Sequence, residues 1–306
     1  MTTLSLTFLG TSAALPTARR NLSGLFLKRG GEAFLVDCGE GTQRQMIRFG
    51  TGFTLRAVLF THFHADHYLG IIGMMRTFAM QGVPGPLTLY GPRPAASLLP
   101  QALHLGIERL DYPLEIVEIA PGEALRGDGY RIEAFATQHR APSLGYALIE
   151  DPRPGKLDVE RARALGMAPG PLFGQLQRGE TLTLPDGRVV RPEDVLGLPR
   201  PGRRVVVSGD TRPCAATVAA AERADLLVHE ATFGDDEAAR AVETTHTTAR
   251  EAARLARDAG ARRLVMTHLS NRYDTEPDTL LHQAQSDHDA CEVAEDGRTV
   301  EVPLRG

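Results

Sequence analysis

The stretch Thr61-His62-Phe63-His64-Ala65-Asp66-His67 places four potential metal-ligand side chains within six positions. It follows the apolar run at 57–60, which is typical of a buried strand, and it precedes an apolar helix that begins near Tyr68. Side chains in such a turn converge at the carboxyl end of a strand, where open α/β folds place their sites. Imidazole and carboxylate together suit zinc and chemically similar metals. The alternative, a polar turn with a chance excess of histidine, predicts no matching ligands elsewhere in the chain.

Matching residues do recur at the ends of other predicted strands. His139 follows an apolar strand at 130–137, Asp210 follows the run at 205–207, and His268 follows the run at 264–266. Seven of the ten histidines lie at or near such strand ends, a distribution that random surface placement would not produce. The sequence therefore predicts one site assembled from distant segments.

The number of ligands predicts two metal ions, because one tetrahedral zinc takes only three or four. To the first ion we assign His62, His64 and His139. To the second ion we assign Asp66, His67 and His268. Asp210 is the expected bridge, since its carboxylate offers one oxygen to each ion. Two such ions activate water and neutralise phosphoryl charge, as in hydrolases, whereas a structural zinc site is closed and usually rich in cysteine.

Strands and helices alternate along most of the chain, which predicts an α/β fold. The expected strands lie at 4–9, 24–29, 33–37, 57–60, 87–90, 114–119, 130–137, 144–149, 205–207, 226–228, 264–266, 291–294 and 299–303. The expected helices lie at 43–49, 70–81, 95–105, 215–223, 246–258 and 277–285.

Residues 151–202 interrupt this alternation and hold eight of the twenty prolines. A segment this long and broken is either a linker or a protruding arm. We favour an arm, because the alternation resumes afterwards and the ligand set continues beyond it.

Composition narrows the class of protein. A net charge of −4 over 306 residues excludes a uniformly basic nucleic-acid coat. The three cysteines, Cys38, Cys214 and Cys291, form no CxxC pair, which favours a reducing compartment and excludes a cysteine-built zinc site. The N-terminus alternates like a strand and lacks a signal-peptide pattern, and no apolar run approaches the roughly 20 residues of a membrane span. We expect a cytoplasmic protein without membrane contact.

The histidine turn with its distant ligands resembles the metallo-β-lactamase superfamily, and further motifs narrow the resemblance to the ribonuclease Z family over essentially the whole chain. These motifs are Phe8–Thr11, Asp37–Gln43, Ser208–Thr211, His229–Phe233 and His268–Tyr273. The resemblance implies a single domain over 1–306 with a four-layered αβ/βα sandwich, into which 151–202 is inserted as a flexible tRNA-binding arm. It also implies two Zn²⁺ per subunit, with Mn²⁺ as the alternative.

The resemblance further implies a homodimeric endoribonuclease that removes the 3′ trailer from precursor tRNA. The products would be a tRNA with a 3′-hydroxyl and a trailer with a 5′-phosphate. Asp66 would orient or deprotonate the attacking hydroxide as well as ligate metal. His246 would protonate the departing oxygen, supported by Glu230. Histidine is suited to act as a general acid near neutral pH. The alternative for His246 is a structural residue at the start of the predicted helix at 246–258.

Substrate contacts are also implied by the resemblance. The expected contact residues are Arg19, Arg20, Asn21, Gly170, Pro171, Gly174, Arg178, Arg272 and Tyr273. Two departures from the family pattern stand out: Ala18 occupies a position where the family has lysine, and Gln177 lies in the arm where lysines are common.

Three alternatives remain at this level. The metal core would also serve a hydrolase of small phosphodiesters or esters, although such an enzyme has no use for the arm. A 3′ exoribonuclease activity would accompany the endonuclease without changing the site. A non-enzymatic RNA-binding module with a vestigial metal site would retain tRNA binding without metal.

Overall fold

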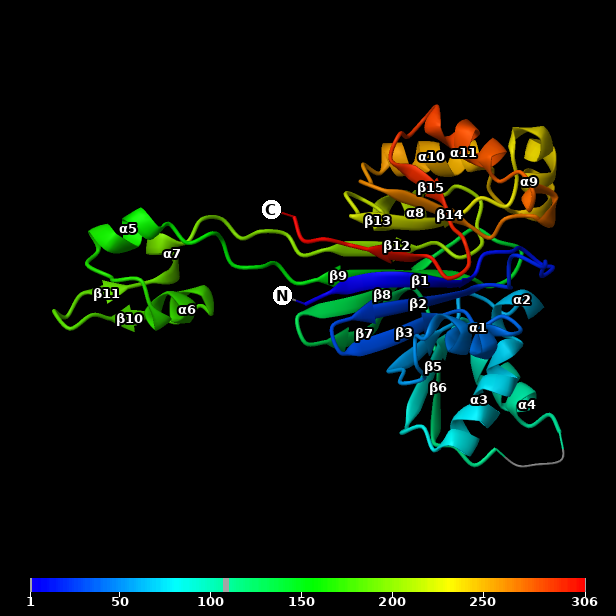
Figure 1. The fold of residues 1–306 in the computed structure, drawn as a ribbon, viewed down its shortest axis with the longest axis horizontal. Helices are drawn as coiled ribbons and strands as arrows, with labels where there is room; N and C mark the ends of the chain where they lie inside the picture. The colour runs from blue at the N-terminus through cyan, green and yellow to red at the C-terminus, as the bar shows by residue number, and fades with distance from the viewer. Residues whose placement is uncertain (1, 107–109, 306) are drawn as a thin grey trace. The chain divides into compact units, whose positions relative to one another are not determined.

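The computed structural model describes residues 2–106 and 110–305, which form two compact units (Figure 1). The larger unit comprises the chain up to Ile149 together with Arg204–Pro303. The smaller unit comprises Glu150–Arg203 with the C-terminal residues from Leu304 onward.

Two sheets, each of seven strands within the described residues, build the larger unit. The first has the order β16 (Thr299–Glu301), β1 (Leu4–Gly10), β2 (Gly24–Arg29), β3 (Glu32–Val36), β4 (Ala57–Leu59), β5 (Leu87–Gly91) and β6 (Leu114–Glu118). The second has the order β15 (Cys291–Val293), β14 (Leu264–Thr267), β13 (Leu226–Glu230), β12 (Arg204–Val207), β9 (Leu144–Glu150), β8 (Tyr130–Ala136) and β7 (Gly122–Gly127). Strands β3 to β6 run parallel, as do β12 to β15, so both sheets present several carboxyl ends at one edge.

The sheets pack face to face because their strands are apolar on both sides, and side chains alternate between the two faces. In β12, Val205 and Val207 lie in the core between the sheets, whereas Val206 lies in the core on the opposite face. Phe34 of the first sheet meets Tyr130 of the second edge to face, with ring centroids 6.0 Å apart. The inner core is thus shared by both sheets.

Helices cover the two outer faces, which gives four layers (Figure 1). The first sheet is covered by α1 (Thr42–Phe49), α3 (Gly70–Gln81) and α4 (Ala95–Leu103). The second sheet is covered by α8 (Ala215–Ala220), α10 (Ala249–Asp258) and α11 (Asp278–Gln285). The predicted αβ/βα sandwich is confirmed. In the part of the chain that the structure describes, no helix is both long and apolar enough to cross a bilayer.

Some elements differ from the sequence prediction. Strand β7 and helix α9 (Ala238–Thr244) were not predicted, and a separate short helix, α2 (Ala65–Tyr68), precedes α3. The helix predicted from 246 begins only at Ala249, because the Thr248 side chain accepts a hydrogen bond from Glu251 N and caps it. His246 therefore lies in the loop before α10, not in the helix.

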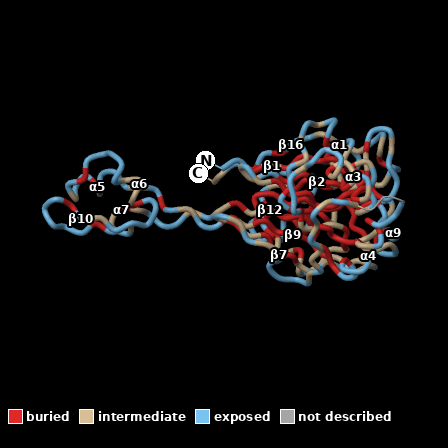
Figure 2. The backbone as a smooth tube through the Cα atoms, turned by 90° about the horizontal axis from the view of Figure 1, so that it is seen from below, coloured by how far each residue is buried: buried red, intermediate tan, exposed pale blue. Residues whose placement is uncertain are grey.

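The smaller unit has its own core despite its proline content. It contains α5 (Val159–Ala164), α6 (Pro171–Gln177), β10 (Leu182–Thr183), β11 (Val189–Val190) and α7 (Pro192–Val195). Buried apolar side chains hold these elements together, and Figure 2 shows buried positions within this unit. They are Ala162, Met167, Leu176, Leu184, Val190 and Val195.

The two segments that enter and leave the smaller unit pair with each other. Arg153 bridges Arg200 and Leu157 bridges Leu196, both antiparallel. At their base Arg203 Nε lies 2.7 Å from Glu150 Oε2, and both side chains are buried. This ion pair joins the two segments at the end of β9 and the start of β12.

A close backbone approach fixes the start of α3 behind the histidine turn, and it yields the first prediction. An added Cβ on Gly70 would lie 2.0 Å from the Gly39 carbonyl oxygen. We expect Gly70→Ala to lower the free energy of unfolding by about 2 kcal/mol, the usual scale of overpacking. Urea denaturation measures the change, with Gly31→Ala as the control because an added Cβ there meets nothing within 4 Å. Equal midpoints for the two variants would contradict the tight packing.

Candidate metal centre and active site

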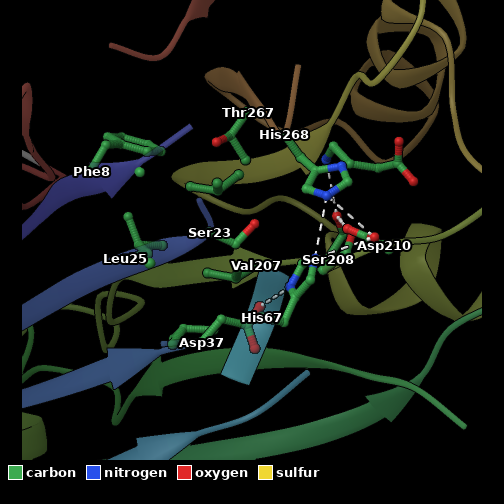
Figure 3. A pocket seen from close by; sticks show the side chains of 16 residues that line it. Phe8, Ser23, Leu25, Asp37, His67, Val207, Ser208, Asp210, Thr267 and His268 are labelled. Atoms are coloured by element: carbon green, nitrogen blue, oxygen red, sulfur yellow. Dashed lines mark hydrogen bonds and ion pairs between the residues drawn. The ribbon is translucent and has the colours of Figure 1, made fainter. Parts of the chain in front are cut away.

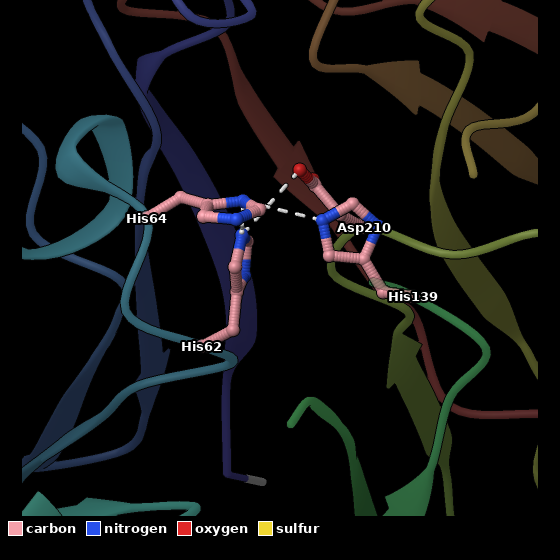
Figure 4. Close-up of side chains that lie close together, drawn as sticks. All are labelled: His62, His64, His139 and Asp210. Atoms are coloured by element: carbon pink, nitrogen blue, oxygen red, sulfur yellow. Dashed lines mark hydrogen bonds and ion pairs between the residues drawn. The ribbon is translucent and has the colours of Figure 1, made fainter. Parts of the chain in front are cut away.

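The first predicted ligand group converges at the edge where the parallel strands end. His62 and His64 lie in the loop after β4, His139 follows β8, and Asp210 follows β12. One ligand atom from each of these four residues lies within 4.8 Å of the others. Figure 4 shows the three rings and the carboxylate facing a common point.

The second predicted group lies beside the first. Ligand atoms of Asp66, His67 and His268 also lie within 4.8 Å of one another. Asp210 Oδ2 is 3.4 Å from His67 Nε2 and 3.4 Å from His268 Nε2. Figure 3 shows Asp210 beside His67 and His268. Asp210 Oδ2 is also 3.6 Å from His62 Nε2, so the Asp210 carboxylate lies between the two groups.

The donor set fits cations. Asp210 Oδ1 is buried and has no hydrogen-bond partner among the described residues. The ring nitrogens approach one another closely: His62 Nε2 is 3.0 Å from His64 Nδ1, and His139 Nε2 is 3.2 Å from the same atom. Neutral imidazoles in this arrangement direct lone pairs at a shared point, which is the geometry of ligands around a metal ion.

The outward nitrogens of the histidines are held by neighbouring groups. His67 Nδ1 lies 2.8 Å from Asp37 Oδ2, and His62 Nδ1 lies 3.1 Å from Thr61 Oγ1. His268 Nδ1 lies 2.9 Å from Thr232 Oγ1. His139 Nδ1 lies 3.0 Å from the Thr245 carbonyl oxygen. Such partners set ring orientation and tautomer, so that the other nitrogen faces the metal.

Burial and charge set the protonation of the first group. Burial lowers the pKa of His62, His64 and His139, which favours the neutral imidazole that binds metal. Burial opposes the charge of Asp210, but His268 and His67 outweigh it and hold the carboxyl pKa well below its usual value.

His67 shows the opposite shift. Burial would lower its pKa, yet the carboxylates of Asp210, Asp37 and Asp66 outweigh burial and raise it well above the usual value. Three buried carboxylates around one ring are an excess of negative charge that cations would balance.

Glu230 and His246 form a buried pair next to this centre. Glu230 Oε1 lies 2.8 Å from His246 Nδ1, and the Glu230 carboxylate also accepts hydrogen bonds from Thr211 N, Thr232 Oγ1 and Thr247 N. Burial would lower the pKa of His246, but the charge of Glu230 and its hydrogen bond outweigh burial and raise it to about 9. The arrangement keeps a proton on the imidazole.

Arg212 holds the backbone of the same histidine. Its Nη1 donates to the His246 carbonyl oxygen at 2.5 Å and to Glu251 Oε2 at 2.8 Å. Glu251 also accepts a hydrogen bond from Thr248 N, which caps α10. Arg212, two residues after Asp210, thereby ties the loop that carries His246 to the start of α10.

A cavity of about 400 Å³ opens beside the centre. His64, Asp66 and His246 line it together with Phe233. Three arginines also line it: Arg140, Arg240 and Arg272. A much smaller cavity of about 40 Å³ is lined by His67 and by residues such as Phe8 and Val207 (Figure 3).

The predicted substrate contacts differ in exposure. Arg19 is exposed and Asn21 is half-buried, whereas Arg20 and Tyr273 are buried. Arg272 is exposed at the cavity and pairs with Glu237. The remaining predicted contacts lie in the smaller unit, at or next to α6: Gly170, Pro171, Gly174 and Arg178.

Sequence reasoning did not identify the groups that orient the ligands. Asp37 closes the predicted strand at 33–37 and begins the motif Asp37–Gln43, which was a usable signal. The structure pairs that strand with β4, which leads to the histidines. Thr232 lies in the motif His229–Phe233 but was given no role of its own, and Arg212 carried no signal, because arginines at loop positions are common.

Comparisons with known proteins give consistent results. The family model "Beta-lactamase superfamily domain" matches residues 180–269, and the model "Anti-Pycsar protein Apyc1" matches residues 4–153. The Ribonuclease Z of Myxococcus xanthus is 62% identical over 306 residues and covers 100% of both chains. The Ribonuclease Z of Haloferax volcanii is 51% identical over 299 residues, covering 97% of this chain and 94% of the relative.

Solved structures share the fold. The short form of human tRNase Z (ELAC1) superposes with a TM-score of 0.72 at 25% identity, covering 98% of this chain and 100% of the human one. The Bacillus subtilis metallo-β-lactamase fold protein YhfI gives a TM-score of 0.68 at 21% identity, with 98% and 100% covered. Full-length identity, fold and a converging His/Asp cluster agree with the sequence prediction of a hydrolytic endoribonuclease. The chain belongs to the ribonuclease Z family of the metallo-β-lactamase superfamily.

Proposed function

We propose that this protein is a zinc-dependent endoribonuclease that removes the 3′ trailer from precursor tRNA. The observation that carries the proposal is the convergence of the predicted ligands around the Asp210 carboxylate, with the Glu230–His246 pair beside it. The names of the relatives support the substrate, since they are called Ribonuclease Z and tRNase Z.

Two cations are proposed for this centre, with Asp210 shared between them. His62, His64 and His139 would hold the first, and Asp66, His67 and His268 would hold the second. Nitrogen and oxygen donors in this ratio favour zinc, with manganese as the alternative. When bound, the ions would supply Lewis acidity that lowers the pKa of water and neutralises phosphoryl charge.

Side chains of the protein would perform the proton transfers of the reaction. Asp66 orients the attacking water and accepts its proton, and the water oxygen bonds to phosphorus as the bond to the 3′ oxygen breaks. Glu230 holds Nδ1 of His246, so that the proton on Nε2 is available to the departing 3′ oxygen. The tRNA leaves with a 3′-hydroxyl, and the trailer keeps a 5′-phosphate.

The smaller unit is proposed as the tRNA-binding arm. It has its own core and carries Gly170, Pro171 and Gly174 at the start of α6, as the family resemblance leads us to expect. It would bind precursor tRNA at a part of the molecule distant from the cleaved bond, largely through phosphates and shape. Action as a homodimer in the cytoplasm belongs to the same proposal.

The shared carboxylate gives the second prediction. Asp210→Ala removes the group common to both ligand sets, so we expect loss of bound metal and of pre-tRNA cleavage. Elemental analysis by mass spectrometry and a cleavage assay measure the two effects. Asp289→Ala is the control, because Asp289 is exposed. Cleavage by the Asp210 variant at the normal rate would exclude the bridging role.

The third prediction separates proton transfer from metal binding. We expect His246→Ala to slow cleavage by roughly 10²–10⁴-fold, the scale of a positioned general acid, while metal content stays unchanged. His104→Ala is the control, since that histidine is exposed at the end of α4. Because His246 also lies within ligand distance of Asp210 and His268, loss of metal in the variant would make it a ligand instead.

The fourth prediction tests the smaller unit by replacing residues 151–202 with Asn-Gly. The design suits the structure, because Glu150 N already donates to Arg203 O at 2.9 Å and β9 is antiparallel to β12. We expect kcat/KM for pre-tRNA to fall at least about 10²-fold, the lower end of what a linked binding site adds. Hydrolysis of bis(p-nitrophenyl) phosphate should be retained. Unchanged pre-tRNA cleavage would exclude the tRNA-binding role.

A further inference from the structure

Arg20 is buried, although it lies in a loop rich in exposed residues. Its side chain and backbone together are only 6% exposed, whereas the neighbouring Arg19 is exposed. Arg20 Nη1 donates to Thr11 Oγ1 at 2.7 Å and to the Ala294 carbonyl oxygen at 2.6 Å. Its Nε lies 3.7 Å from Asp274 Oδ1. The guanidinium is therefore engaged inside the protein and is largely shielded from solvent.

Asp296 fastens both ends of the same loop, residues 11–21. It accepts hydrogen bonds from Thr11 Oγ1 at 2.8 Å and from Asn21 N at 2.7 Å. Gln45 Nε2 donates to the same carboxylate at 2.8 Å, which ties the loop to α1. Thr11 Oγ1 thus connects the Arg20 guanidinium to the Asp296 carboxylate.

The tip of the loop reaches the metal centre. Ala14 N donates to Asp66 Oδ2 at 2.8 Å, and Ala13 N donates to the carbonyl oxygen of Leu269, the residue after His268, at 2.9 Å. Ala14 has φ 57°, a left-handed conformation that alanine rarely adopts. Such a conformation persists only where the surrounding contacts determine it. The loop therefore presents an N–H to a predicted ligand at a conformational cost.

We propose that Arg20 is a positioning residue that fixes loop 11–21, so that the Ala14 N–H orients the Asp66 carboxylate for metal binding. The inference rests on the proposed role of Asp66 as a ligand, and it replaces the expectation that Arg20 contacts RNA. Among the described residues, the Asp66 carboxylate has hydrogen-bond partners of two kinds. One is His268, itself a predicted ligand, and the other is the Ala14 N–H, which belongs to no predicted ligand. Groups that hold a metal ligand from behind typically change metal affinity by 10–100-fold when removed.

The two roles for Arg20 predict opposite effects. A positioning role lowers zinc affinity and kcat and leaves the KM for pre-tRNA unchanged. A phosphate contact would raise KM and reduce the slope of log affinity against log salt concentration by about 1, with zinc affinity unchanged. Arg19 is the matched control, because it is the exposed arginine of the same loop.

The experiment compares Arg20→Met, Thr11→Val and Arg19→Met with the wild type in the full chain. Zinc affinity is measured by chelator competition, and loop opening by hydrogen–deuterium exchange of peptides covering residues 11–21. Thr11→Val keeps the side-chain shape and removes only the hydroxyl between Arg20 and Asp296, so it tests the link if Arg20→Met fails to fold. Kinetics on pre-tRNA and on bis(p-nitrophenyl) phosphate complete the set.

We expect Arg20→Met and Thr11→Val to exchange faster in the loop and to bind zinc about 10–100-fold more weakly, with kcat reduced on both substrates. Arg19→Met should match the wild type in zinc affinity and exchange. Unchanged zinc affinity and unchanged hydrogen exchange in both Arg20→Met and Thr11→Val would overturn the inference. If the wild type cleaves only the small phosphodiester while the zinc and exchange effects persist, the RNA function fails and the inference stands.

Discussion

The position of one buried carboxylate constrains this structure. Asp210 lies between two groups of histidines, and its Oδ1 has no hydrogen-bond partner among the described residues. A buried charge without compensation is expensive, so the surroundings must supply positive charge at that point. The ligands come from both sheets, at positions as distant as 62 and 268, and the sandwich brings their strand ends to one edge. The need to neutralise Asp210 thus links the architecture to the site.

Around this carboxylate the protein is organised in successive layers of hydrogen bonds. Asp37 and Thr232 hold histidine rings, and Glu230 is itself held by four backbone or hydroxyl donors. Arg212 and Arg20 lie one layer further out, and each ties a loop backbone to the core. Arginine suits this task because its guanidinium donates in several directions at once. Side chains that do not reach the centre thus hold the loops around it.

The sequence predicts the fold well where periodicity is strong. Runs such as 205–207 mark strands buried on both faces, and polar residues directly after them mark the site edge. The prediction fails where local chemistry decides. The sequence prediction placed His246 inside a helix, whereas the helix is capped by Thr248 and begins after it. The sequence does not reveal this cap, because Thr248 is one of several neighbouring threonines. Burial of Arg20 could not be anticipated, since arginine is mostly exposed and its partners at 274, 294 and 296 lie far away in sequence.

The smaller unit is inserted between β9 and β12, which are antiparallel neighbours that a simple turn could join. The ion pair between Glu150 and Arg203 holds the two ends of the insertion together. An insertion at such a point leaves the sandwich and its strand register undisturbed. Variation among lineages can then remodel, shorten or exchange the inserted segment without selection against misfolding of the hydrolytic framework. The smaller unit and the metal centre can therefore change independently of each other in sequence.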